Sequence, residues 1–405
     1  MRRTVRPWGK LLELYTGLAR HEQNPFRDSY VMRAMATACE LPARAMKDYV
    51  KPTYVVWEDL GDMEVELEER VVHRLPFADL LNFPTGSSNR PKVLIAAALS
   101  GHYATLLQDT IRGFARDFDP YITDWKDARE VPAEAGEFGF DDYVEHLIKF
   151  LEVLGPGTHL IATCQAAPPA MVAAAVMAKR GSDCVPASLT LMGGPVDTRV
   201  SPIFINKIAD KIPLRAIQRN NIHTIPKGYP GSGRRVYPGF FQLSGFMMLN
   251  PKPHVKQYYS FVKNSLKGDD EALQKFRDFY DEYFAVLDMT EAFYLDTLKK
   301  VFVEHHIPTG QMTYRDEKVD FAGVTDMSLL TVEGENDNFC PPGQTEAAHG
   351  IFSGIPADRH KNYIQEGVGH YGVFSGSRFQ QHIYPVIRDF IYAAETETMR
   401  VPVEA

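Results

Sequence analysis

The chain has 405 residues, a length that suits one large α/β domain with an insertion or two ordinary domains. Hydrophobic residues make up 44% of it and charged residues 24%, which excludes a disordered or fibrous protein. The net charge of -8 comes without a basic block, so nucleic acid is not expected as a partner. No apolar run reaches the roughly 18 residues of a transmembrane helix, and no signal-peptide core is present. A cytoplasmic location is therefore expected.

Four cysteines are spread along the chain without CxxC pairs or other metal-ligand spacing. They are Cys39, Cys164, Cys184 and Cys340. Neither a disulfide framework nor a metal site is indicated, so we expect reduced thiols and no bound metal.

Predicted elements alternate between helices and strands along most of the chain. Residues 1–50 have helical periodicity, and residues 55–74 have strand-like alternation broken by a turn. A buried-type apolar run, residues 93–99, precedes a Ser-Gly break and an amphipathic helix, which together form one βα unit. Further predicted strands lie at residues 120–128, 159–164, 187–197, 326–337 and 361–370, and further helices at residues 143–155, 343–352 and 379–394.

This alternation predicts an α/β fold with a mainly parallel, doubly wound sheet. Residues 201–313 interrupt it, because they are rich in aromatic residues and methionine and have helical periodicity without clear strands. We therefore predict three parts. They are an N-terminal helical segment (1–50), a core (51–200 and 314–395) and an inserted helical cap or lid (201–313).

One cysteine lies at a predicted strand-to-helix junction, in the string HLIATCQAAPPAM. A nucleophile at such an elbow needs small residues two places before and after it, and Ala162 and Ala166 occupy those places around Cys164. A buried, inert cysteine is the alternative interpretation. A thiol nucleophile also needs a partner that accepts its proton.

Two residues later in the chain can supply that partner. Asp337 follows the predicted strand 326–337, and His370 follows the next one, in the chain order nucleophile, acid, histidine. The carboxyl ends of parallel strands converge on one edge of a sheet, where both would meet Cys164. A turn aspartate and a surface histidine are the ordinary alternatives. Glu335 and Asp197 are rival acids, of which we rank Asp337 first.

Backbone N–H groups near the elbow are candidates for an oxyanion hole. Gln165, directly after the cysteine, is one candidate, and the second comes from Ser100 or Gly101 in the loop LSGHY. Gly101 could instead mark a simple break between a strand and a helix. His102 is a candidate substrate contact, although a structural role is the more common one for such a side chain.

Seven strings follow one another in a consistent order between about Pro25 and Ile391. They are LSGHYATLL, YITDWKDAREVP, HLIATCQ, RRVYPGFFQLSGFM, FYDEYFAVLDMTEAFYLDTL, TVEGENDNFCPPGQTEAAH and GVGHYGVFSGSRF. Together they resemble the intracellular poly(3-hydroxyalkanoate) depolymerases, of the poly(3-hydroxybutyrate) type. The resemblance implies an α/β-hydrolase fold with Cys164 as the acyl-accepting residue, Asp337 as the acid and His370 as the base.

Two departures from that family's pattern concern the site. The family usually has a second acidic residue where this chain has Asn338, and an isoleucine where it has Phe339. Because Asn338 carries no charge, Asp337 is favoured as the acid. The family tends to have Cys-Gln-Pro where this chain has Cys-Gln-Ala-Ala-Pro-Pro, which puts the chain-length preference in doubt.

The expected activity is cleavage of 3-hydroxybutyrate ester bonds in stored polyester, with the acyl group passing to water or to coenzyme A. No cofactor is otherwise expected. The expected partner is the surface of a storage granule, and homo-oligomerisation is left open. The alternatives are a related polyester synthase, which ordinarily has glycines where this chain has Ala162 and Ala166, and an inactive granule-binding protein.

The predicted cap contains an unusually apolar string, RVYPGFFQLSGFMMLN. Phe240, Phe241 and Phe246 within it either fill a core or contact an apolar polymer. The second interpretation makes them candidate substrate-binding residues, because each large side chain buried against polymer contributes roughly 1.5–3 kcal/mol.

Overall fold

A computed structural model of the chain describes residues 2–47, 49–59, 64–86, 89–203, 213–249 and 251–398. Its internal contacts divide the chain into two compact units. The first, which we call the helical unit, consists of residues 1–52 and 243–286. The second, the sheet unit, consists of residues 53–242 and 287–405.

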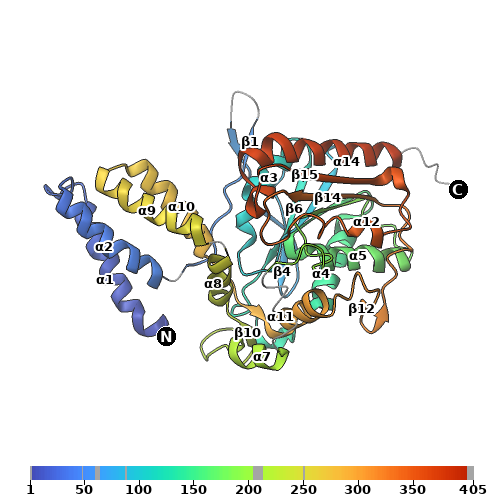
Figure 1. The fold of residues 1–405 in the computed structure, drawn as a ribbon, viewed down its shortest axis with the longest axis horizontal. Helices are drawn as coiled ribbons and strands as arrows, with labels where there is room; N and C mark the ends of the chain where they lie inside the picture. Colours follow the sequence, from blue (N-terminus) through green and yellow to red (C-terminus); the bar gives the residue numbers. More distant parts are fainter. Residues whose placement is uncertain are drawn as a thin grey trace. The chain divides into compact units, whose positions relative to one another are not determined.

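An eight-stranded sheet forms the centre of the sheet unit, with the strand order β15-β14-β8-β7-β5-β6-β4-β3 (Figure 1). The five pairings from β15 to β6 are parallel, and the two that involve β4 are antiparallel. The strands are β3 (Arg70–Arg74), β4 (Ala78–Asn82), β5 (Lys92–Ala96), β6 (Asp119–Trp125), β7 (His159–Thr163), β8 (Ser188–Met192), β14 (Ser328–Gly334) and β15 (His360–Gln365). This order confirms the mainly parallel sheet that the sequence predicts.

Helices cover both faces of this sheet, which explains its nearly continuous apolar strands. Every residue of β7, β8 and β14 is buried. Two helices, α3 (Gln108–Phe114) and α14 (Tyr384–Thr398), lie on one side, and α4 (Phe140–Leu154) and α5 (Ala167–Lys179) lie on the other (Figure 1). The sheet is therefore doubly wound, as predicted.

Smaller elements complete the sheet unit. The predicted cap region contributes a small antiparallel sheet in the order β11-β10-β9, which the sequence does not predict because two or three residues are too few to reveal a period of two. The short strands are β1 (Trp57–Asp59), β2 (Glu64–Glu66), β9 (His223–Thr224), β10 (Arg235–Tyr237), β11 (Met289–Thr290), β12 (Thr313–Tyr314) and β13 (Glu317–Lys318). The short helices are α7 (Leu214–Asn221), α11 (Glu291–Thr297), α12 (Ala348–Ile351) and α13 (Gly376–Arg378).

Single turns of 3₁₀-helix and π-helix lie between these elements. The 3₁₀ turns are η1 (Ala104–Leu107), η2 (Ala133–Ala135), η3 (Cys164–Ala166), η5 (Ala357–Arg359) and η6 (His370–Val373). The π-helical turns are η4 (Leu298–Val303) and η7 (Phe379–Ile383). Two of them, η3 and η6, carry predicted site residues.

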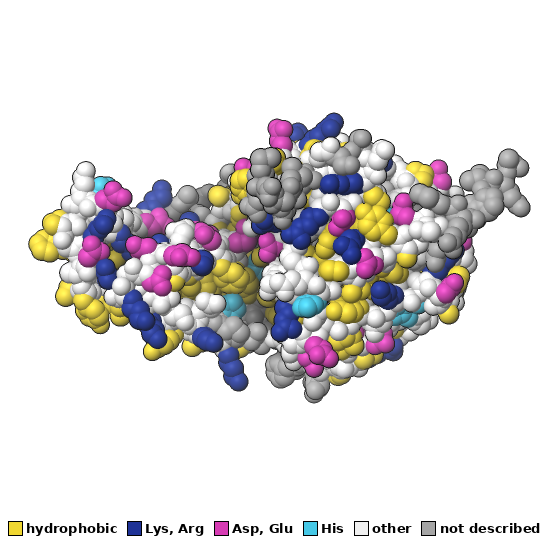
Figure 2. All heavy atoms as spheres, turned by 90° about the horizontal axis from the view of Figure 1, so that it is seen from above, with side chains coloured by type: hydrophobic (Ala, Val, Ile, Leu, Met, Phe, Trp, Pro, Cys, Tyr) yellow, Lys and Arg dark blue, Asp and Glu magenta, His cyan; other side chains and the backbone are white. Residues whose placement is uncertain are grey.

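The helical unit joins the N-terminal helices to part of the predicted cap. It contains α1 (Arg2–Arg20), α2 (Tyr30–Met46), α9 (Pro251–Lys267), α10 (Asp270–Phe284) and most of α8 (Gly239–Leu249). Its core is an aromatic cluster on α9 and α10, made of Phe261, Leu273, Phe276, Tyr280 and Tyr283. Figure 2 shows hydrophobic side chains in yellow that also reach the surface of this unit.

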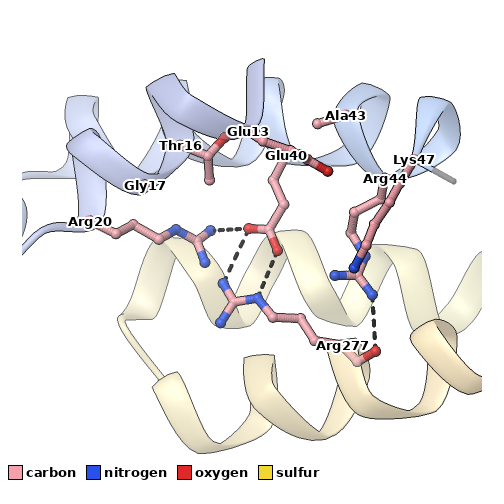
Figure 3. A pocket seen from close by; sticks show the side chains of 9 residues that line it. All are labelled: Glu13, Thr16, Gly17, Arg20, Glu40, Ala43, Arg44, Lys47 and Arg277. Carbon is pink, nitrogen blue, oxygen red and sulfur yellow. Dashed lines mark hydrogen bonds and ion pairs between the residues drawn. The ribbon is translucent and has the colours of Figure 1, made fainter. Parts of the chain in front are cut away.

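A charged pocket of about 270 Å³ lies among α1, α2 and α10 within the helical unit (Figure 3). The buried Glu40 carboxylate forms an ion pair with Arg20 Nη2 at 2.7 Å and accepts a hydrogen bond from Arg277 Nε at 2.7 Å. Burial raises the pKa of the Glu40 carboxyl, against the opposing charges of Arg20 and Arg44. This network links α1 to α10 through α2.

The two units group the chain differently from the predicted division. Residues 243–286 of the predicted cap belong to the helical unit together with residues 1–52, while the rest of residues 201–313 that the structure describes belongs to the sheet unit. The boundary falls inside α8. A lid function for the inserted segment stays a prediction.

Candidate active site

The predicted elbow lies between β7 and α5. Cys164 directly follows β7 and has a φ of +51°, a left-handed conformation that a non-glycine residue rarely adopts. Ala162 and Ala166 are fully buried on either side of it. Gly194, after β8, packs so closely against this turn that a Cβ there would lie 2.2 Å from the Cβ of Ala167. The backbone is therefore strained, and the turn is closely packed.

Asp337 and His370 come together at the ends of β14 and β15. His370 Nδ1 donates a hydrogen bond to Asp337 Oδ2 at 2.7 Å, and both side chains are buried. The second carboxylate oxygen, Oδ1, accepts hydrogen bonds from the backbone N–H groups of Phe339 at 2.8 Å and Cys340 at 2.9 Å. The carboxylate is thus held on both sides, and it orients the imidazole ring.

The Cys164 side chain lies within hydrogen-bonding reach of His370. Burial alone would lower the pKa of His370, but the negative charges of Cys164 and Asp337 and the hydrogen bonds to both raise it to about 10. A negative charge on Cys164 and the Asp337 carboxylate thus both favour the protonated form of the His370 ring. The structure brings together all three residues that the sequence indicates.

The two rival acids have other partners. Asp197 forms a bidentate ion pair with Arg199, at 2.8 Å for both oxygens, which lowers the pKa of Asp197. Glu335 is exposed and accepts a hydrogen bond from the backbone N–H of Gly367 at 2.8 Å.

Gly193 lies beside the candidate acid and base, and the sequence pattern does not single it out. It has a φ of +53°, and a Cβ there would lie 3.3 Å from Asp337 Oδ2 and 3.5 Å from His370 Cε1. The absence of a side chain lets the end of β8 pass directly beside the acid and the base. The signal was a pair of glycines after a predicted strand, in the string LMGGPVD.

Aromatic rings surround the imidazole. The ring centroids of Phe339 and Phe374 lie 5.0 and 5.2 Å from that of His370. These rings limit access of water to the hydrogen bond between Asp337 and His370. Phe339 is the position at which the chain departs from the family's usual isoleucine.

Glu333 is a second residue that the sequence reasoning missed. Its fully buried carboxylate, on β14, accepts hydrogen bonds from the backbone N–H groups of Gly343, Thr345 and Glu346 at 2.7–3.2 Å. Thr345 Oγ1 in turn bonds to the backbone N–H and C=O of Gly194 at 2.9 and 3.0 Å. Glu333 therefore ties the loop after Asp337 to the glycine beneath the elbow. The sequence signal for Glu333 is a single acidic residue within an otherwise uncharged, apolar strand.

The candidate oxyanion residues lie in two segments of the sheet unit. Gln165 follows Cys164 within η3, and Ser100 and Gly101 lie after β5, Gly101 with a φ of +102°. A Cβ on Gly101 would lie 2.7 Å from Gln242 Oε1, so the Gln242 carboxamide packs against this loop. The buried Oε1 atoms of both glutamines have no hydrogen-bond partner among the described residues. His102 is buried.

The candidate aromatic residues occupy different environments. Phe240 is 40% exposed, and its ring lies 4.3 Å from that of the partly buried Phe241. Phe241 also stacks on His223, at 5.5 Å between ring centroids. The Phe246 side chain lies outside the described part of the structure. A role of these residues in substrate binding stays a prediction.

Two further findings concern metal sites and membrane-spanning helices. Among the residues that the structure describes, no group of three or more His, Cys, Asp or Glu side chains could hold a metal ion. None of the described helices has an apolar stretch sufficient to cross a bilayer.

The sheet order, the elbow after β7 and the acid and histidine after the next parallel strands define an α/β-hydrolase fold. Residues 193–395 match the family described as PHB de-polymerase C-terminus, which is half of the chain. The chain therefore belongs to the PHB depolymerase family, and this confirms the resemblance seen in the sequence. Membership of this family supports the hydrolysis of carboxylic esters as the class of reaction of this chain.

Solved structures with a similar fold include lipases. A monoglyceride lipase from Saccharomyces cerevisiae has 9% identity and a TM-score of 0.48, and the match covers 81% of this chain and 96% of that one. A putative lipase from Acinetobacter baumannii has 13% identity and a TM-score of 0.45, with 82% and 93% covered. No curated protein is similar enough to this sequence to count as a match.

Proposed function

We propose that the protein cleaves 3-hydroxybutyrate ester bonds of a storage polyester through a cysteine acyl-enzyme. Cys164 is the nucleophile, His370 the base and acid, and Asp337 the group that orients His370. The observation that carries this proposal is the buried hydrogen bond of 2.7 Å between His370 and Asp337 beside a cysteine with a φ of +51°.

The first half-reaction forms a thioester. His370 holds the proton of the Cys164 thiol, and the thiolate attacks the ester carbonyl carbon. The carbonyl oxygen becomes an oxyanion, which the backbone N–H groups of Gln165 and of Ser100 or Gly101 stabilise. The C–O bond of the ester then breaks. The alkoxide leaves with the proton from His370, and the acyl group stays on Cys164 Sγ.

The second half-reaction releases the acyl group. His370 takes a proton from the incoming water, whose oxygen attacks the thioester carbonyl, and the C–S bond breaks to return the thiolate. The product is a carboxylic acid. With coenzyme A as the acceptor, the attacking atom is its sulfur and the product is a new thioester. Asp337 stays ionised and supports the imidazolium through both steps.

In this proposal the enzyme acts on a solid polyester particle. It does so in the cytoplasm, at the surface of a storage granule. Support for a polyester comes from the family match over residues 193–395. A strained backbone costs free energy and is found mainly at functional sites. The left-handed conformation of Cys164 therefore supports an active enzyme over an inactive granule-binding protein. The polyester synthase alternative is disfavoured because Ala162 and Ala166 occupy positions where a synthase ordinarily has glycines.

A release assay on amorphous poly(3-hydroxybutyrate) particles tests the proposal. We expect the Cys164→Ala variant to lose more than about 10³-fold in product release while its circular dichroism is unchanged. The matched controls are Cys184→Ser and Cys39→Ser, which should lose less than about tenfold. Running the assay with and without coenzyme A identifies the acceptor. Release by Cys164→Ala at close to the parent rate would refute the nucleophile assignment.

A further inference from the structure

The two N-terminal helices expose a broad face without charged residues. On α1, Pro7, Leu11, Leu14 and Leu18 follow one another at helical spacing and are all exposed, the three leucines by 56–61%. On α2, the exposed stripe is also apolar throughout. It consists of Val31, Met35, Ala38, Pro42 and Ala45. We call these two stripes together the hairpin face.

The two stripes belong to one surface. Tyr15 lies between the α1 stripe and α2, and its hydroxyl contacts Met35 Sδ at 3.8 Å. Trp8 lies seven residues, or about two helical turns, before Tyr15 on the same side of α1, and it is 66% exposed. Apolar surface this extensive marks an interaction site on a soluble protein, because its exposure to water is unfavourable.

The opposite side of α1 is fixed within the helical unit. Glu13, Thr16, Gly17 and Arg20 line the charged pocket, where Arg20 pairs with Glu40 (Figure 3). A Cβ on Gly9 would lie 2.9 Å from Met46 Cβ, so α1 packs tightly on α2. The polar residues of α1 therefore face the charged pocket, small residues such as Gly9 pack against α2, and the apolar stripe faces outward.

The charge of this segment is opposite to that of the whole chain. Residues 1–47 contain nine Lys and Arg residues and four Asp and Glu residues, a balance of +5, whereas the chain carries -8. Two copies joined through the hairpin face would bring two cationic segments together. A surface that is apolar and negatively charged is a better complement.

We infer that the hairpin face is the surface by which this protein adsorbs to a polyester particle. The inference rests on the proposed function, because each ester cleavage leaves a carboxylate end on the particle. An eroding polyester surface is thus apolar and increasingly anionic, as the hairpin face requires. Adsorption and cleavage then reside in different units of the chain.

Binding of the full chain to amorphous poly(3-hydroxybutyrate) particles tests the inference. The protein carries Cys164→Ala, so that the particles are not consumed, and the bound fraction is measured by sedimentation. Leu11→Gln with Leu18→Gln should weaken adsorption at least about tenfold. Val31→Gln with Met35→Gln should do the same from α2. The matched control is Val153→Gln with Ile364→Gln, two exposed residues of the sheet unit, which should bind as the parent does.

Further measurements distinguish a polyester particle from other partners of the hairpin face. Emission from the exposed Trp8 should move to shorter wavelength on adsorption, and Lys10→Glu or added salt should weaken binding. Equal adsorption by the hairpin variants and the control would overturn the inference. So would stronger binding to anionic phospholipid vesicles than to particles, or an oligomer that the hairpin variants dissociate while adsorption is unchanged.

A different measurement, the cleavage of a soluble ester, tests the proposed function. With Cys164 present, the hairpin variants should cleave a soluble 3-hydroxybutyrate ester within about twofold of the parent. An inactive parent enzyme would contradict the proposed function, whereas an active parent with unchanged adsorption in the hairpin variants would contradict only the role of the hairpin face.

Discussion

The two units of the chain expose their hydrophobic residues very differently. Among the described residues, 22 large hydrophobic side chains are exposed, and 13 of them belong to the helical unit. That unit has only 96 of the 405 residues. The sheet unit instead buries its apolar side chains beneath two layers of helices and holds every candidate catalytic residue.

The difference follows from what each task needs. Acyl transfer requires groups held at fixed positions, and Asp337, His370 and Glu333 are all buried and hydrogen-bonded. Adsorption to an insoluble substrate requires apolar area that is available outside. If the two tasks are divided in this way, changes in the sheet unit affect chemistry, and changes in the helical unit affect attachment.

Among changes to the sheet unit other than loss of Cys164, replacing the acid should reduce activity most. Asp337→Asn should lower kcat/KM for a soluble ester by about 10²- to 10⁴-fold, because the imidazolium loses its anionic support. The charge of Asp337 is also one cause of the raised pKa of His370. The alkaline limb of the kcat/KM profile should therefore move to lower pH in the variant.

Asp197→Asn is the matched control, since Asp197 pairs with Arg199 outside the site. Its kcat/KM and pH profile should stay close to those of the parent. A large loss in Asp197→Asn and a small one in Asp337→Asn would assign the acid to the loop after β8.

Glu333→Gln should have the next largest effect. The carboxamide places N–H groups against backbone donors, which should lower the free energy of unfolding by about 1–3 kcal/mol. The loop that bonds to Gly194 would loosen, so kcat should fall while adsorption to particles stays unchanged. Chemical denaturation and soluble-ester kinetics check both results. The exposed Glu335→Gln is the control, and an equal effect of both changes would remove any special role for Glu333.

Much of the sheet unit could be predicted from the sequence, for a physical reason. Parallel strands buried on both faces are apolar runs between amphipathic helices, and their order places Cys164, Asp337 and His370 at one edge. Gly193, Gly194 and Glu333 could not be assigned in this way. Their roles depend on contacts with segments distant in sequence, which no local pattern contains.

The helical unit was harder to predict. Helical periodicity in residues 1–50 and 201–313 predicted helices, but periodicity does not say which helices pack together. The association of α1 and α2 with α10 depends on Glu40, which pairs with Arg277 at a sequence separation of 237 residues. The hairpin face was missed because an outward apolar stripe has the same spacing as a buried one.

Phe240→Ser with Phe241→Ser tests whether the sheet unit also contributes to adsorption, because both residues belong to that unit. We expect this pair to weaken particle adsorption more than it slows cleavage of a soluble short ester, but less than the hairpin variants weaken adsorption. Phe241 stacks on His223, so a modest drop in melting temperature should accompany the change. Equal losses on both substrates with a large drop in melting temperature would identify the pair as core.

The smallest expected effect concerns acid stability of the sheet unit. His349 Nδ1 lies 2.7 Å from His360 Nδ1, and His349 Nε2 lies 2.8 Å from Thr331 Oγ1. Burial, together with the nearby charge of His360, lowers the pKa of His349 to about 4. The folded state therefore resists protonating His349, while the unfolded chain binds a proton near its usual pKa of about 6.5.

The stability that neutral His349 provides is present above pH 6.5 and is lost as the pH falls toward 4. The melting temperature of the parent should decline by a few degrees across that window, and His349→Gln should flatten the decline because glutamine does not titrate. His382→Gln, at an exposed position, is the control and should keep the parental slope. Where two unfolding transitions are resolved, only that of the sheet unit should move. An unchanged slope in His349→Gln would show that acid acts elsewhere, and a shift confined to the helical unit would contradict the assignment of this pair.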